Sequence, residues 1–154
     1  MRIALGSDED HPTARSVLAW LKQQGYEVHA VGVLDGPALP WPQVAQGVAQ
    51  GVISGQADEG ILFCWTGTGV ALAANKLRGI RAALCADAET ARGARLWNDA
   101  NVLCLSLRST TPAVAEEILQ AWFAAHYQPN PQDDACLAAV REIEARSAAP
   151  DSAP

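Results

Sequence analysis

The residues best suited to chemistry in this chain are Cys64 and the glycine-rich run that follows it, Trp65-Thr66-Gly67-Thr68-Gly69. The apolar stretch Ile61-Leu62-Phe63 before the cysteine predicts a buried strand. After the glycines, an alanine-rich segment over 70–76 predicts the start of a helix. A strand, a glycine turn and a helix in succession aim several backbone N–H groups at one place, which attracts negative charge. A thiol there forms a thiolate more readily than an isolated one, so the pattern predicts a base or nucleophile beside an anion cradle.

Simpler interpretations of the same residues stay open at this point. Cys64 could be an inert thiol at a strand end, because free cysteines are commonly buried. Gly67 and Gly69 could form a tight turn and nothing more. The strand before them and the Ala-Ala-Asn sequence after them favour a ligand loop.

Composition limits the classes of protein to consider. The chain has 154 residues, enough for one domain with a real core, and 49% of them are hydrophobic, which disfavours disorder. No apolar run approaches the ~20 residues that cross a bilayer, and the N-terminus lacks a signal peptide, so we expect a cytoplasmic protein without a membrane partner. A net charge of −6 disfavours nucleic acid as a partner.

Cysteine and histidine usage predicts neither a disulfide framework nor a metal site. The four cysteines form no CxxC pair, and the three histidines are scattered, so nothing resembles a zinc site. Cys85 and Cys104 lie in apolar stretches and are expected to be packed thiols. We expect no cofactor and no metal.

Hydrophobic periodicity predicts alternating strands and helices. Strands are expected at 2–5, 28–33, 60–64, 80–84 and 102–107, with helices between them and a last helix near 133–145. Asp10 is expected to cap the first helix, with Pro12 in its first turn. Residues 1–146 are predicted to form a single domain, and 147–154, which lack large apolar side chains, a disordered tail.

This alternation predicts an α/β fold: a three-layer α/β/α, Rossmann-like architecture with a five-stranded, mostly parallel sheet. In such sheets the ligand binds beyond the carboxyl ends of the strands. Asp8 and Cys64 both follow or end a strand, so topology alone brings them together.

These residues and their neighbours resemble the ribose-5-phosphate isomerase B / galactose-6-phosphate isomerase family over about residues 1–127. The blocks that carry the resemblance, in order and at nearly the family's spacing, are Gly6-Ser7-Asp8, Cys64 to Gly69, Ala73-Ala74-Asn75-Lys76, Gly79 to Leu84, Thr90-Ala91-Arg92 and Asn98 to Leu103.

The resemblance implies an aldose–ketose isomerase that works without a metal through a cis-enediolate. It implies that Cys64 is the general base, that Thr66 and the amides of Gly67 to Gly69 hold the enediolate oxygen, and that Asp8 binds sugar hydroxyls and helps ring opening. The catalytic residues expected are therefore Cys64, Thr66 and Asp8. Those expected to contact the substrate are Ser7, His11, Trp41, Trp65, Gly67, Thr68, Gly69, Asn75, Trp97, Asn98 and Arg108.

The chain departs from the family pattern where the ring is opened and the phosphate is held. Glu9 stands where the family has His, and Trp97 stands at the place of the ring-opening His. Pro131 and Ala135 fall at the positions of two phosphate-binding arginines, and neither can form a bidentate clamp. We therefore expect a substrate other than a simple pentose 5-phosphate.

Two further family positions carry tryptophan: Trp65 replaces the Gly after the cysteine, and Trp41 replaces a Tyr. With Trp97 they favour stacking on a sugar face or an aromatic group. Arg108 matches a family arginine and is the preferred anion contact.

Several of these residues have plainer alternatives. Asp8 could be a turn residue, and His11 a surface residue at a helix start. Trp97 fits interface packing as well as a pocket wall. Arg92 and Arg95 are expected to be surface charges on a solvated helix.

Trp97 and Asn98 precede the fifth strand, so they lie toward the amino end of the sheet, away from Cys64 of the same chain. The family brings the matching segment from a neighbouring subunit. The resemblance therefore implies a homodimer with shared active sites, joined by a large apolar interface.

The sequence thus favours an isomerase acting on a small sugar or sugar phosphate. A non-catalytic protein that binds a sugar phosphate or nucleotide in the same cleft is the alternative. A mononucleotide-binding Rossmann-type protein is less favoured, because Gly6-Ser7-Asp8 replaces the GxGxxG fingerprint after the first strand.

Overall fold

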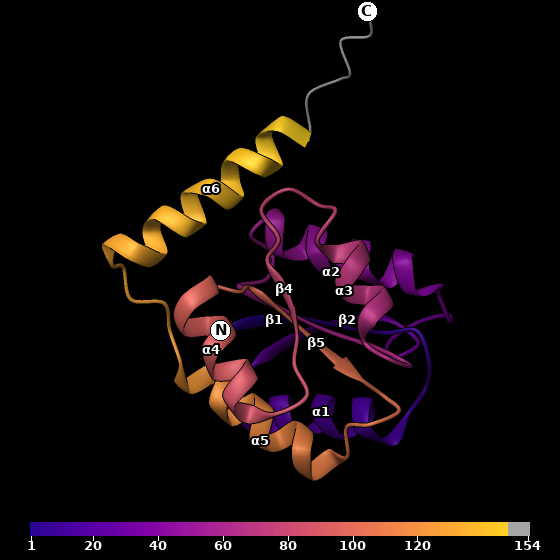
Figure 1. Cartoon of the computed structure of the whole chain (residues 1–154). Coiled ribbons are helices and arrows are strands. Elements are labelled where there is room, and N and C mark those ends of the chain that lie inside the picture. Colours follow the sequence, from indigo (N-terminus) through magenta and orange to yellow (C-terminus); the bar gives the residue numbers. More distant parts are fainter. Residues whose placement is uncertain (148–154) are drawn as a thin grey trace, which may run out of the picture.

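A computed structural model of the chain describes residues 1–147 as five strands that alternate with helices, followed by a C-terminal helix (Figure 1). The elements are β1 (Arg2–Ser7), α1 (Pro12–Gln23), β2 (Glu27–Gly32), α2 (Trp41–Ile53), β3 (Glu59–Cys64), α3 (Thr68–Ala74), β4 (Ala82–Leu84), α4 (Ala88–Asn98), β5 (Val102–Ser106), α5 (Pro112–Ala124) and α6 (Pro131–Ser147). All predicted strands are present, with ends shifted by one or two residues. Ser147 belongs to α6, and the rest of the predicted tail, 148–154, lies outside the described residues.

The five strands form one sheet in the order β2-β1-β3-β5-β4, and every neighbouring pair is parallel. The predicted α/β class is confirmed, and the sheet is wholly parallel. From β1 the chain first builds outward to β2 and then crosses to β3 on the other side of β1. The carboxyl ends of β1 and β3 therefore flank the switch point of the sheet, the place where ligands bind in open α/β sheets.

Helices cover both faces of the sheet. Figure 1 shows α2 and α3 on one face and α1 and α5 on the other. Two buried clusters match these two interfaces, one centred on Ile3, Phe63 and Trp122, and one centred on Val48 and Leu62. This is the three-layer arrangement that the alternating pattern predicts.

Glycines let α2 lie close to the sheet. A Cβ atom at Gly6 would lie 2.6 Å from Val44, and one at Gly60 would lie 2.8 Å from Val48. This close approach sets the position of Trp41 at the start of α2, next to the carboxyl ends of the strands.

Helix α1 is capped by His11, which corrects the expectation for Asp10. The backbone N–H of Thr13 donates to His11 Nδ1 at 3.2 Å. Asp10 instead accepts a hydrogen bond from Arg15 Nε at 2.7 Å. The cap falls to His11 because it is the residue directly before Pro12, the first residue of the helix.

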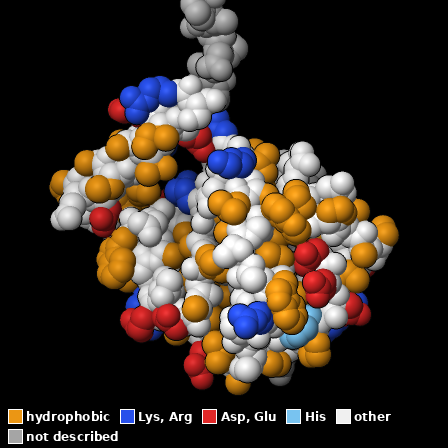
Figure 2. Space-filling model, turned by 45° about the vertical axis from the view of Figure 1, so that its right-hand side comes forward, with side chains coloured by type: hydrophobic (Ala, Val, Ile, Leu, Met, Phe, Trp, Pro, Cys, Tyr) orange, Lys and Arg blue, Asp and Glu red, His pale blue; other side chains and the backbone are white. Residues whose placement is uncertain are grey.

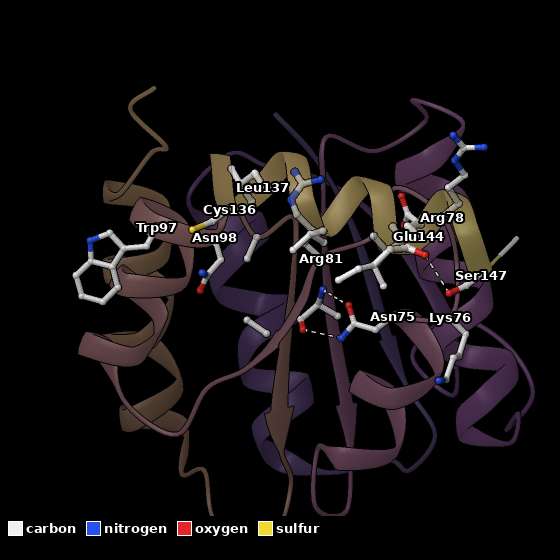
Figure 3. A pocket seen from close by; sticks show the side chains of 16 residues that line it. Asn75, Lys76, Arg78, Arg81, Trp97, Asn98, Cys136, Leu137, Glu144 and Ser147 are labelled. Carbon is white, nitrogen blue, oxygen red and sulfur yellow. Dashed lines mark hydrogen bonds between the residues drawn. The ribbon is translucent and has the colours of Figure 1, made fainter. Parts of the chain in front are cut away.

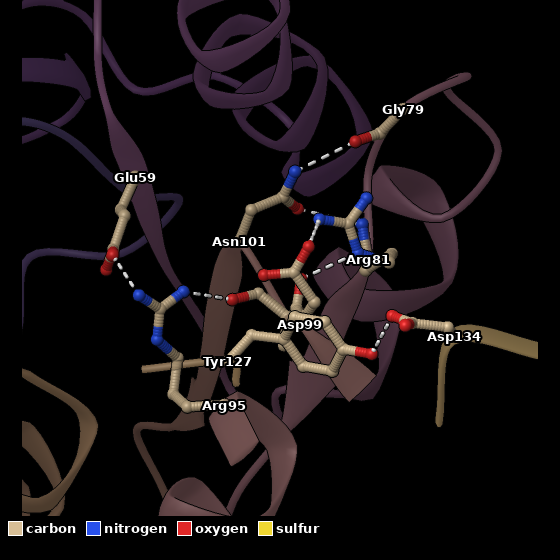
Figure 4. A network of polar contacts seen from close by, with 9 residues as sticks. Glu59, Gly79, Arg81, Arg95, Asp99, Asn101, Tyr127 and Asp134 are labelled. Atoms are coloured by element: carbon tan, nitrogen blue, oxygen red, sulfur yellow. Dashed lines mark hydrogen bonds and ion pairs between the residues drawn. The ribbon is translucent and has the colours of Figure 1, made fainter. Parts of the chain in front are cut away.

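A buried ionic network ties β3 to α4 and α5, and it corrects the expectation that Arg95 is a surface charge. Arg95 is 8% exposed and donates from Nη2 to Glu59 Oε1 at 2.5 Å (Figure 4). Trp122 Nε1 donates to Glu59 Oε2 at 2.6 Å, and the Arg95 guanidinium lies 5.0 Å from the Trp122 ring centroid. Arg92 is exposed and pairs with Glu89, as expected.

Helix α6 stands off from the body of the protein, as Figures 1 and 2 show. Only Leu137 of this helix is buried, whereas Val140 and Ile143 are 49% and 56% exposed. Tyr127 holds the start of α6 through a hydrogen bond to Asp134 at 2.6 Å (Figure 4). Within residues 1–147, none of the helices combines the length and apolar character needed to span a bilayer.

Candidate active site

Cys64 is the last residue of β3, a central strand whose six residues are all buried. Cys64 is 5% exposed and belongs to the buried apolar cluster that includes Leu62 and Val70, at the carboxyl end of the sheet. The register pairs Cys64 with Ser106 of β5, and Ser7 of β1 with Phe63. The sheet thereby places Asp8, directly after β1, beside the strand that carries Cys64.

The turn after Cys64 is compact because Gly67 adopts a left-handed conformation, with φ of +74°. A Cβ atom at Gly67 would lie 2.5 Å from Leu84 Cδ1 and 3.0 Å from the carbonyl oxygen of Leu105. Only glycine fits this conformation and this space without strain. The predicted glycine turn from β3 into α3 is therefore present, pressed against the ends of β4 and β5.

The loop after β5 supports the turn from behind. The Trp65 carbonyl accepts hydrogen bonds from the Ser106 hydroxyl and from the Arg108 amide, both at 2.9 Å. The Cys64 carbonyl accepts from the amides of Gly67, at 3.2 Å, and Leu107, at 3.0 Å. No sequence pattern indicates this role of Ser106, because its partner is a backbone atom 41 residues away.

The amides at the turn are not equivalent. The Gly67 amide donates to the Cys64 carbonyl at 3.2 Å, so in this structure it is less available to a ligand than the two amides that follow it. The amides of Thr68 and Gly69 have no acceptor among residues 1–147, as the first residues of a helix do not. The hydroxyls of Thr66 and Thr68 lie 2.6 Å apart, and both residues are exposed.

Two of the predicted aromatic residues lie at this turn. Trp41 packs against the backbone of Gly69, where a Cβ atom would lie 3.1 Å from the indole ring. Trp65 follows Cys64 directly, and Trp41 and Trp65 remain 42% and 51% exposed. They offer exposed aromatic surface at the turn after Cys64, suited to contact with an apolar face of a ligand.

Asp8 carries an unsatisfied buried atom, which is uncommon in native proteins. Its Oδ1 is buried and has no hydrogen-bond partner among residues 1–147. Burial raises the pKa of the Asp8 carboxyl above its usual value, and the charge of Glu9 acts in the same direction. The Oδ1 atom of this carboxyl, at the switch point, thus keeps an unused capacity to accept a hydrogen bond.

Of the other residues expected to contact a substrate near Asp8, Ser7 and His11 make hydrogen bonds within the chain. The Ser7 side chain is buried and donates from its hydroxyl to the Glu9 carbonyl at 2.7 Å. The His11 Nδ1 atom caps α1, which leaves Nε2 as the only ring nitrogen free to meet a ligand. Arg108 is exposed and extends from the loop after β5.

Asn75, Trp97 and Asn98 lie apart from Cys64, around a pocket of about 750 Å³ between α6 and the β4 edge (Figure 3). Figure 3 shows Trp97 and Asn98 at one end of this pocket and Lys76 and Arg78 toward the other. The position of Trp97 and Asn98 at the end of α4, before β5 begins, is the amino-end position that the sequence predicts.

The Asn75 amide holds the edge strand β4. Its Oδ1 accepts from the Ala82 amide and its Nδ2 donates to the Ala82 carbonyl, both at 2.8 Å. Each end of the amide makes one hydrogen bond within the chain, and one N–H and one lone pair stay available on this exposed residue. The substrate contact expected of Asn75 stays a prediction.

Cys64, the turn with the Thr68 and Gly69 amides that are unpaired among residues 1–147, and Asp8 with its unsatisfied Oδ1 thus all lie at the carboxyl ends of neighbouring strands of a parallel α/β sheet. The place of this group at the switch point of an open α/β sheet makes it a candidate site for a small polar ligand. The family described as Ribose/Galactose Isomerase matches residues 3–138, and the chain belongs to this family. Its members are sugar-phosphate isomerases.

Individual relatives share about a third of their residues with this chain. It is 33% identical over 144 residues to the galactose-6-phosphate isomerase subunit LacB of Clostridium acetobutylicum, covering 93% of this chain and 83% of the relative. It is 35% identical over 130 residues to the D-erythrulose-4-phosphate isomerase of Pectobacterium atrosepticum, covering 83% and 86%. The solved structure of ribose-5-phosphate isomerase B from Clostridium thermocellum matches with a TM-score of 0.90 and 36% identity, covering 96% of this chain and all of that one.

Proposed function

We propose that this protein interconverts an aldose and a ketose phosphate by proton transfer between adjacent carbons, with Cys64 as the base. The Cys64 thiolate removes the proton from the carbon beside the carbonyl. The C–H electron pair forms the C=C bond of a cis-enediolate, and the carbonyl oxygen takes the negative charge. The same sulfur then returns the proton to the neighbouring carbon. The hydroxyl proton moves from the second oxygen to the first, so the second carbon becomes the new carbonyl and the first oxygen becomes a hydroxyl. The observation that supports this proposal is that Cys64 ends β3 and leads directly into a turn whose Thr68 and Gly69 amides have no acceptor among residues 1–147.

In this proposal the donors at the turn stabilise the charge that develops on the substrate oxygen. The amides of Thr68 and Gly69 and the Thr66 hydroxyl are fixed before the reaction, so they need no reorganisation when the enediolate forms. Asp8 accepts hydrogen bonds from substrate hydroxyls through its unpartnered oxygen. Trp41 and Trp65 contact the sugar chain.

We further propose that the substrate is not ribose 5-phosphate. Pro131 and Ala135 occupy the first turns of α6 and offer no cation for a phosphate group. Arg108 is the remaining exposed arginine on the loop behind the turn. Relatives at similar identity are named for substrates of different chain length, a galactose and an erythrulose phosphate, which supports a family in which the substrate varies.

A comparison of substrates tests both parts of the proposal. Purified protein is incubated in D₂O with ribose 5-phosphate, galactose 6-phosphate and erythrulose 4-phosphate, and deuterium at the exchanging carbon is measured by mass spectrometry. We expect exchange with at least one substrate, loss of that exchange in Cys64→Ser, and slow turnover of ribose 5-phosphate. Efficient turnover of ribose 5-phosphate would refute the changed substrate. Thermal protection by a sugar phosphate without any exchange would favour a non-catalytic binding protein.

We also propose a homodimer in which Trp97 and Asn98 of one subunit complete the site around Cys64 of the other. Trp97 is 62% exposed, and the apolar face of α6 is open at Val140 and Ile143. Such surface is typical of an interface that the isolated chain leaves uncovered. A monomer by light scattering at micromolar concentration would contradict the proposal.

Mixing two inactive variants tests whether the sites are shared. Cys64→Ser and Asn98→Ala are unfolded together, refolded and assayed. Random pairing makes half of the dimers mixed, and each mixed dimer holds one intact site, so about a quarter of the wild-type activity returns. If both variants form dimers and mixing restores nothing, each site is built from one chain.

A further inference from the structure

The hydroxyl groups of Thr66 and Thr68 form a close pair at the turn after Cys64. The two oxygens lie 2.6 Å apart, a short distance for an O–H···O hydrogen bond. The pair forms because Gly67 between them is left-handed and bends the chain, so side chains two residues apart face each other. Neither hydroxyl has another hydrogen-bond partner among residues 1–147.

The number of hydrogens in the Thr66–Thr68 pair limits what it can donate to a ligand. Each hydroxyl has one hydrogen and can accept two hydrogen bonds. One hydrogen lies between the two oxygens, so the pair keeps a single hydrogen to offer outward. Both residues are exposed, so that hydrogen is accessible to a ligand.

We propose that Thr68 is a positioning residue that donates to Thr66 and thereby aligns and strengthens the hydrogen bond from Thr66 to the enediolate oxygen. This inference rests on the proposed function of the turn. When an anionic oxygen accepts from the Thr66 hydroxyl, Thr66 becomes a better acceptor for the Thr68 hydrogen, and the two bonds reinforce each other. The charge is greatest in the enediolate, so the coupling acts on that state more than on the bound sugar.

A simpler role for Thr68 makes a different prediction. Thr68 is the first residue of α3, and its hydroxyl could merely stabilise the start of that helix. In that case the loss of the hydroxyl would lower thermal stability and would affect all ligands equally. If Thr68 acts through Thr66, loss of the Thr68 hydroxyl weakens only ligands that carry an oxyanion at the reacting carbons. It does so only while the Thr66 hydroxyl is present.

The test uses Thr68→Val, which keeps the shape of the side chain, Thr68→Ser, which restores the hydroxyl, and Thr66→Val. Thr90→Val is the matched control, because Thr90 is also exposed and hydrogen-bonded, to Asp87 near the start of α4. Binding of two probes is measured by calorimetry. One is a phosphorylated aldonohydroxamate, whose adjacent oxygens mimic the enediolate, and the other is the alditol phosphate of the same chain length, which carries no oxyanion at the reacting carbons.

We expect Thr68→Val to weaken hydroxamate binding about fivefold to tenfold, the effect of one hydrogen bond, and to leave alditol phosphate binding within about twofold of wild type. Thr68→Ser restores hydroxamate binding, and Thr90→Val changes neither probe. In the Thr66→Val background, Thr68→Val has little further effect, because the path through Thr66 is already broken.

The inference is overturned if Thr68→Val weakens both probes equally, changes neither, or adds its full effect in the Thr66→Val background. It is also overturned if wild type binds the hydroxamate no better than the alditol phosphate. The proposed function has a separate test, because it fails when wild type exchanges no deuterium into any sugar phosphate, whatever the hydroxamate result. Where a substrate is found, Thr68→Val should lower kcat and leave KM nearly unchanged.

Discussion

The backbone N–H of Leu107 donates to the carbonyl oxygen of Cys64 at 3.0 Å, so the loop after β5 fixes the end of the strand that carries the thiol. Gly67 fits in the narrow space between Leu105 of β5 and Leu84 of β4. The backbone position of Cys64 therefore depends on contacts made by the loop after β5 and by the strands on either side of the turn. Changes in the backbone of the turn should be felt in catalysis as well as in stability.

Gly67→Ala should damage both properties. Its left-handed φ of +74° costs an alanine about 1–2 kcal/mol, and the new Cβ would lie 2.5 Å from Leu84 Cδ1. The turn must shift to relieve this contact, so we expect deuterium exchange into the substrate to fall at least about tenfold, as misplaced catalytic groups cause. Gly25→Ala is the control, because Gly25 has φ of +81° with nothing within 4 Å of the added Cβ. Equal losses of exchange in both variants would contradict this reading of Gly67.

Arg95→Met should be the most destabilising of the charge substitutions considered, because it leaves the buried Glu59 carboxylate without its cation. Removal of one partner of a buried pair costs about 3–5 kcal/mol, measurable by urea unfolding. The double variant Glu59→Leu with Arg95→Met should be less destabilised than the sum of the two single variants.

The exposed pair of Arg2 and Asp58, 2.5 Å apart, provides the comparison for that network. Arg2→Met should change the free energy of unfolding far less than Arg95→Met does, since water screens an exposed pair. If Arg2→Met and Arg95→Met have the same free energy of unfolding, Arg95 does not stabilise the fold as its burial indicates.

The elements and the neighbourhood of Asp8 and Cys64 were predictable because they depend on local pattern and on topology. An apolar run that ends in Cys64 and a helix start after Gly69 are visible in adjacent residues, and parallel topology brings strand ends together. The role of Arg95 was missed because its spacing from Glu89 and Arg92 is that of an exposed helix face. Its partner Glu59 lies 36 residues away in the chain.

Other side-chain roles were missed because the partner is a backbone atom that sequence patterns do not reveal. The Asn75 amide pairs with the backbone of Ala82 across the loop before the edge strand. The Ser106 hydroxyl binds the Trp65 carbonyl. The one visible signal in hindsight is Glu59 itself, an acidic residue that begins an otherwise apolar strand, which indicates a buried partner elsewhere.

The four cysteines should differ strongly in their rates of alkylation. Burial raises the pKa of Cys85 to about 12, with the charge of Asp87 contributing, and burial raises the pKa of Cys104 as well. At pH 8 a thiol of pKa 12 is ionised in about one molecule in ten thousand, and only the thiolate reacts. Iodoacetamide should therefore label the exposed Cys136 first and Cys64 second, with Cys85 and Cys104 unmodified in the folded protein.

Mass spectrometry of tryptic peptides reads the order of labelling directly. In Cys136→Ser, slow labelling should map to Cys64 and should track the loss of deuterium exchange into the substrate. Early modification of Cys104 in native conditions would show that the sheet opens far more readily than its burial implies.

Asp8→Asn should stabilise the folded protein at neutral pH while it removes a group from the site. Burial raises the pKa of Asp8, so the folded state favours the protonated carboxyl. The stability that this preference contributes is fully present below the unfolded pKa of about 3.9. It is lost as pH rises through the pKa of the folded state. The stability that Asp8→Asn gains over wild type should therefore grow between pH 4 and pH 7, and the difference in Tm between the two proteins should grow with it. The gain should stay below about 1 kcal/mol, because the carboxyl is partly solvated.

Asp58→Asn is the control of opposite sign. The Arg2 guanidinium lowers the pKa of Asp58, so that variant should lose stability at pH 7 and approach wild type as pH falls below the usual range of Asp. The same pH trend in both variants would mean that Asp8 is not held in an unfavourable place, and the reason to assign it to substrate hydroxyls would be gone.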